Sequence, residues 1–93
     1  MNIIIEDIAV EYIAENGGAA FVRYTKQGWC HSGTVDVAVI DLGEPDGDPE
    51  DYQPFNVKHI TLYLPRKLVQ QSEEVEISLS TLLRWKKLML ERY

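Results

Sequence analysis

The sequence contains a single cysteine among its 93 residues, and this excludes several kinds of site. An intrachain disulfide needs two cysteines, and a zinc site made only of cysteine needs four. Histidine is also scarce, because only His31 and His59 are present. No nucleophile elbow, phosphate-binding glycine loop, paired-histidine protease motif or zinc-ribbon spacing occurs. The sequence therefore favours a protein that is not an enzyme.

Long hydrophobic runs and an excess of positive charge are missing too. No apolar run approaches the roughly 20 residues of a membrane span, and Glu6 interrupts the first residues before a signal-peptide core develops. The formal net charge of −6 repels phosphate groups, which argues against nucleic acid or an anionic membrane as partner. With 45% hydrophobic residues, we expect one domain over residues 1–93 in a cytoplasmic protein.

Hydrophobic periodicity predicts one helix followed by strands. Apolar residues recur at spacings of three and four from Ile5 to Ile13, which predicts an amphipathic helix over residues 7–16. Gly17 and Gly18 then end the helix. Alternating apolar residues predict strands over 19–26, 34–42, 55–64 and 75–79.

Residues 81–93 fit a short helix or a turn followed by a strand, and we favour a strand over 86–92. An amino-terminal helix followed by four or five short strands is an α+β pattern. No internal repeat or low-complexity segment is present.

The loop over residues 27–33 carries the most reactive side chains, Cys30 and His31. A neighbouring protonated histidine stabilises a thiolate, and loops are accessible to ligands. The alternative is a small buried cysteine beside a surface histidine, since free cysteine is commonly an inert core residue. Two metal ligands are fewer than the four of a closed zinc site, so metal binding here requires a second subunit or ligands other than cysteine.

Three other polar features have simpler explanations. The acidic stretch 43–54 does not fit a calcium loop, because placing Gly47 at the invariant glycine puts Leu42 and Gln53 at the first and last ligand positions. We interpret it as an exposed acidic loop. His59 is expected at a strand edge or surface rather than as a ligand. A solvated basic face explains Arg84, Lys86, Lys87 and Arg92, with head-to-tail association between subunits as the alternative.

The order of these features resembles the HesB-like group, which includes the A-type iron–sulfur carriers. The order is helix, Gly17-Gly18, strand, cysteine loop, strand, acidic loop and then the segment DYQPFNVKHITLYL at 51–64. The sequence looks most like the small bacterial HesB-related branch with a Cys-Cys or Cys-selenocysteine motif. Cys30 is in the place of the first cysteine, and His31 stands where the second member of the pair would be. The resemblance implies a small, mostly antiparallel, partly barrel-like sheet with the amino-terminal helix packed against it.

The chain departs from the A-type carriers at its end, because residues 90–93 contain neither of the two further cysteines of that group. The leading hypothesis is a small non-enzymatic HesB-like protein in which Cys30 and His31 form a degenerate thiol or metal site, completed across a subunit interface. Iron, an iron–sulfur cluster and zinc are the candidate groups, and a homo-oligomer or another protein is the expected partner.

Two alternatives to this hypothesis stay open. One is a protein-interaction module that keeps the fold without metal chemistry, binding through its acidic loop or hydrophobic strands. The other is a redox or persulfide-handling protein that uses the Cys30 thiol alone, which lacks a resolving cysteine within the chain.

Overall fold

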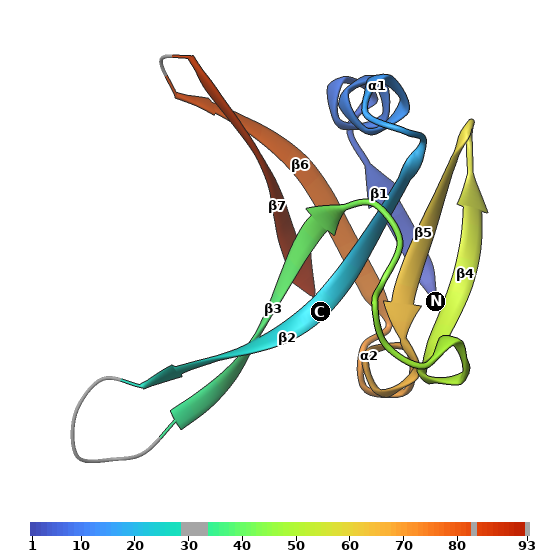
Figure 1. The fold of residues 1–93 in the computed structure, drawn as a ribbon, viewed down its shortest axis with the longest axis vertical. Coiled ribbons are helices and arrows are strands. Elements are labelled where there is room, and N and C mark those ends of the chain that lie inside the picture. The colour runs from blue at the N-terminus through green and yellow to red at the C-terminus, as the bar shows by residue number, and fades with distance from the viewer. Residues whose placement is uncertain (29–33, 83, 93) are drawn as a thin grey trace.

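The computed structural model describes residues 1–28, 34–82 and 84–92 (Figure 1). Its elements follow one another as β1 (Asn2–Ile5), α1 (Asp7–Glu15), β2 (Ala19–Gly28), β3 (Thr34–Leu42), the 3-10 helix η1 (Pro49–Asp51), β4 (Tyr52–Val57), β5 (Ile60–Pro65), α2 (Arg66–Gln71), β6 (Glu74–Leu82) and β7 (Trp85–Arg92). None of the helices in these described ranges is long and apolar enough to cross a membrane.

The strands form two sheets, one of three strands in the order β1-β6-β7 and one of four in the order β3-β2-β5-β4. The pairs β2–β3, β4–β5 and β6–β7 are antiparallel, whereas β1 runs parallel to β6 and β2 runs parallel to β5. Figure 1 shows α1 at one end of the sheets and α2 at the other. The expected α+β composition is therefore present.

Side chains from both sheets and both α-helices make one hydrophobic core. The largest fully buried side chains are Ile13, Val22, Leu62, Leu64, Leu68, Val75 and Ile77. Burying a side chain of this size contributes about 1.5–3 kcal/mol relative to leaving it exposed. The buried positions alternate along β5 and β6, as expected for strands with one face toward the core.

The predicted helix over 7–16 is confirmed, since α1 ends at Glu15 with Asn16 as its C-cap. Gly17 and Gly18 have φ angles of +110° and +80°, a region that glycine enters without strain. The Gly18 N–H donates to the Ile13 carbonyl at 2.9 Å and satisfies one of the free acceptors at the helix end. The two glycines thus end the helix and start β2.

Two parts of the expected architecture are wrong. A strand, β1, precedes the helix, so the helix is not the first element. Its sequence, Asn-Ile-Ile-Ile, has no alternation, and its partner β6 is distant in the chain, so no local pattern indicates it. The partly barrel-like sheet is also not found, because the strands separate into two sheets with β3 and β7 each at an edge.

In the second half of the chain, the structure matches some of the predicted elements and differs from others. The strand expected over 55–64 is a hairpin, because Lys58 and His59 form the turn between β4 and β5. Lys58 adopts φ +54°, which a sequence without glycine there does not indicate. Helix α2 was not expected. The preference for a strand over 86–92 is confirmed by β7, and the strand over 75–79 lies within β6.

Candidate functional site

The segment with the predicted site, Cys30 and His31, lies outside the described residues. The strands on either side of it are described, and they pair in register from Ala20 opposite Leu42 to Gly28 opposite Thr34. Residues 29–33 therefore join the two strands of one long antiparallel hairpin. Residues 27 and 28 of the expected loop over 27–33 belong to β2, the rest of that loop lies outside the described residues, and the metal-ligand role of Cys30 and His31 stays a prediction.

The described residues do not form a metal site by themselves. Among the described residues, no three His, Cys, Asp or Glu side chains lie close enough together to hold a metal ion. His59, the other histidine, is exposed in the β4–β5 turn, where its surface position was expected. Cys30 and His31 alone supply two donors, a thiolate and an imidazole, which suit zinc and iron in kind but not in number.

The carboxyl-terminal strand contacts the hairpin that carries Cys30. Arg92 Nη1 donates a hydrogen bond of 3.2 Å to the Tyr24 hydroxyl, and its guanidinium carbon lies 5.7 Å from the centre of the Tyr24 ring. Lys67 Nζ, from α2, lies 5.1 Å from the same ring centre. Two cations and one aromatic ring thus connect the end of β7, α2 and the middle of β2.

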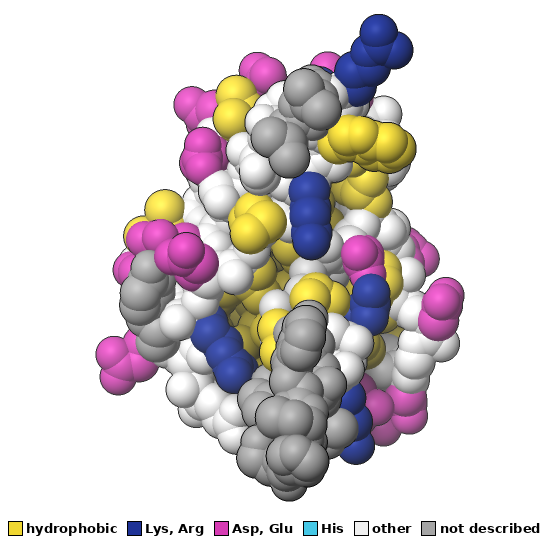
Figure 2. Space-filling view, turned by 90° about the vertical axis from the view of Figure 1, so that its left-hand side faces the viewer, with side chains coloured by type: hydrophobic (Ala, Val, Ile, Leu, Met, Phe, Trp, Pro, Cys, Tyr) yellow, Lys and Arg dark blue, Asp and Glu magenta, His cyan; other side chains and the backbone are white. Residues whose placement is uncertain are grey.

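A hollow of about 510 Å³ separates the edges of β3 and β7. Consecutive residues of each strand line this hollow. Because the side chains of consecutive residues point to opposite faces of a sheet, the hollow must border the backbone edges of both strands. Figure 2 shows hydrophobic side chains gathered in a hollow with Lys and Arg side chains around it. At this surface, Arg23 on β2 pairs with Asp41 on β3.

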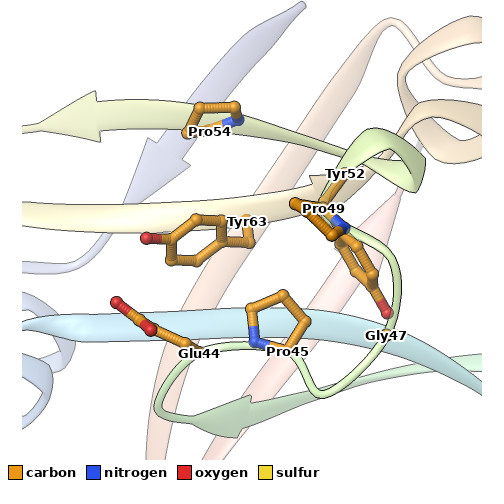
Figure 3. A pocket seen from close by; sticks show the side chains of 7 residues that line it. All are labelled: Glu44, Pro45, Gly47, Pro49, Tyr52, Pro54 and Tyr63. Carbon is orange, nitrogen blue, oxygen red and sulfur yellow. The ribbon is translucent and has the colours of Figure 1, made fainter.

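A second hollow, of about 340 Å³, lies beneath the acidic loop, and we call it the tyrosine–proline pocket. Its lining residues are Glu44, Pro45, Gly47, Pro49, Tyr52, Pro54 and Tyr63 (Figure 3). The stretch 43–54 was predicted to be an exposed acidic loop, but its last three residues belong to β4. Sequence analysis missed the pocket because Tyr63 comes from β5, and only the register of β5 against β4 brings it beneath the loop.

One titratable group of the described chain has a clearly displaced pKa. Lys58 Nζ donates a hydrogen bond to Asp7 Oδ1, and this bond, together with the lysine charge, lowers the pKa of Asp7 below its ordinary value of 3.8. The pair joins the first turn of α1 to the β4–β5 turn. Both side chains are exposed. The pair connects two elements of the fold and lies far from Cys30 in sequence.

Comparisons with known proteins define the fold and the family. The model of a family described as the CC/Se motif containing family matches residues 1–93. The crystal structure of SufA from Escherichia coli, described as involved in the biosynthesis of iron–sulfur clusters, superposes with a TM-score of 0.69. That alignment has 15% identity and covers 97% of this chain and 79% of SufA. No curated protein matches the sequence. The HesB-like resemblance is thereby confirmed for the fold.

Proposed function

Because the chain belongs to the CC/Se motif containing family, we propose that it is a small non-enzymatic protein whose Cys30 thiol, with His31 beside it, forms an iron–sulfur-related metal site. The observation that carries the proposal is the position of Cys30. The only cysteine of the chain lies between the paired residues Gly28 and Thr34, in the hairpin of a SufA-like fold where the family resemblance puts the first cysteine.

The number of metal ligands in one chain is too small for a closed site, so we propose that two subunits share the metal. Each chain supplies one thiolate and one imidazole, so two chains supply the four donors that a closed tetrahedral site needs. A metal that two subunits share stabilises the assembled form and is lost when either donor type is removed. The family resemblance supports iron as the first metal to test, with zinc the other metal for which this donor set is suited.

The test is elemental analysis combined with native mass spectrometry on protein purified without oxygen. We expect iron or zinc at one metal or one cluster for every two chains. Both Cys30→Ser and His31→Ala should remove it, whereas the control His59→Ala should retain it because His59 is exposed on a separate turn. Equal metal content in wild type and Cys30→Ser would exclude the proposed site.

A second candidate function, an interaction module without metal chemistry, is favoured by the exposed Trp85, which is 77% accessible. Large aromatic side chains are enriched where proteins bind one another. Under this function, Cys30→Ser leaves partner association unchanged and Trp85→Ala reduces it. The same set of variants therefore separates the two candidates.

A further inference from the structure

We propose that the protein associates with itself head to tail, with Arg84 and Trp85 of one copy inserted into the tyrosine–proline pocket of the next. Arg84 and Trp85 are called the β6–β7 tip below. The proposal concerns residues remote in sequence from Cys30 and does not rest on metal binding. It extends the interaction candidate by specifying both surfaces and the partner, a second copy of this chain.

The tyrosine–proline pocket has the chemistry to hold an arginine and an aromatic ring. In Figure 3 the Tyr63 ring and Pro45 lie on opposite sides of the space, with Tyr52 at one end and the Glu44 carboxylate at the other. Tyrosine rings attract a guanidinium through their π faces, and a carboxylate pairs with it. A volume of about 340 Å³ is near the lower limit for ligand pockets and suits one or two side chains.

The loop that forms the pocket is fastened in place, so the pocket exists before binding. The Asp48 side chain accepts a 3.0 Å hydrogen bond from the Glu50 N–H at the start of η1. Arg66 Nε donates a 2.6 Å hydrogen bond to the Glu50 carbonyl from the adjoining helix α2. A preformed pocket avoids the entropic cost of ordering a loop during association.

The pocket is also surrounded by negative charge. Glu44, Asp46, Asp48, Glu50 and Asp51 are all exposed within eight residues of chain, from 44 to 51. None of these five carboxylates has an ion pair recorded among the described residues. Such a concentration of one sign attracts a cationic surface and speeds the encounter with it.

The β6–β7 tip presents the complementary groups. Trp85 is 77% accessible, the most exposed of the large hydrophobic side chains described, and Arg84 beside it is exposed. Lys86 and Lys87 continue the positive charge along β7. Tryptophan and arginine are the residues most often found at the energetic centre of interfaces. An apolar ring with cations around it thus matches a tyrosine–proline pocket with carboxylates around it.

The two surfaces lie too far apart to meet within one molecule. Figure 1 shows the end of the β6–β7 hairpin projecting on one side, while the loop between β3 and β4 lies on the opposite side. A contact between them must therefore join different copies. Because the two surfaces differ, a single contact leaves one tip and one pocket unoccupied, and association that no reciprocal contact closes continues into rings or open chains.

Sedimentation velocity over a wide concentration range, at low and high salt, tests the proposal. We expect wild type to form oligomers that grow with concentration and weaken as salt screens the charges. Glu44→Lys and Arg84→Glu should each weaken association at least about tenfold. Mixing the two variants should restore association with the two chains in equal numbers, because the unaltered tip of Glu44→Lys meets the unaltered pocket of Arg84→Glu, and the reversed tip and reversed pocket also carry opposite charges.

Matched controls keep the result interpretable. Glu15→Lys and Lys26→Glu change the net charge equally at exposed positions elsewhere and should leave association unchanged. Circular dichroism verifies folding, and Trp85→Ala and Glu44→Gln provide milder changes at both surfaces. Association that persists in Cys30→Ser with a chelator present distinguishes this contact from metal bridging. A wild type that stays monomeric, or variants that do not complement when mixed, would overturn the proposal.

Discussion

The β2–β3 and β6–β7 hairpins are built alike but end in different chemistry. Each has strands of eight to ten residues, and the half next to the core contributes buried side chains, such as Val22 in one and Ile77 in the other. The far end of the first hairpin leads to Cys30 and His31, whereas the far end of the second has Arg84 and Trp85. In a long hairpin, therefore, the half at the core stabilises the fold by packing. The far half does not have to pack, so its residues can serve binding.

The largest effect should come from the core half of either hairpin. Ile77 is 1% accessible, so Ile77→Ala leaves a cavity and should lower the free energy of unfolding by about 2–5 kcal/mol. Trp85→Ala, at the far end of the same hairpin, should change it by less than about 0.5 kcal/mol. Urea denaturation measures both. Similar losses for the two variants would contradict the division between the halves.

The next effect concerns the two hairpin ends, which should control metal binding and self-association separately. Cys30→Ser should abolish bound metal without altering self-association, and Trp85→Ala should weaken self-association about tenfold or more without altering metal content. Native mass spectrometry on both variants and on their combination reads the two properties together. If one substitution disturbs both properties, the hairpin ends do not act independently.

A smaller effect should come from the contact that joins the hairpins. Arg92→Ala and Tyr24→Phe each remove the 3.2 Å hydrogen bond between β7 and β2, and each should cost about 0.5–1.5 kcal/mol of stability. The double variant should cost less than the sum, because both substitutions remove one shared interaction. A strictly additive result from thermal or urea unfolding would show that the contact adds nothing to stability.

The smallest effect should come from the Asp7–Lys58 pair, which lies outside both hairpins. Folding lowers the pKa of Asp7, so the stability it contributes is fully present above the ordinary value of 3.8 and is lost as pH falls through the lowered pKa. Asp7→Asn should flatten this part of the stability curve, while Glu11→Gln, elsewhere on α1, should leave it intact. Identical acid profiles for wild type and Asp7→Asn would show that the pair makes no contribution.

Local patterns were sufficient to predict elements whose signals lie within a few residues. Helix α1 has apolar residues at helical spacing and two glycines at its end, and β2, β3 and β6 have plain alternation. The turn at Lys58 was missed because a left-handed lysine has no compositional signal, and β1 was missed because its partner is remote. The tyrosine–proline pocket depends on tertiary placement of Tyr63, while the prediction of Cys30 and His31 rests on residue chemistry and family resemblance.

The parallel pairing of β1 with β6 also determines when the molecule can finish folding. Asn2 lies opposite Glu74, so β1 finds its partner only after another 72 residues have been made. Contacts of such long sequence separation slow folding, because the chain must close a large loop before the pairing stabilises it. The amino-terminal segment Asn-Ile-Ile-Ile therefore stays unpaired through most of synthesis. We expect the pairing of β1 with β6 to be a late step of folding.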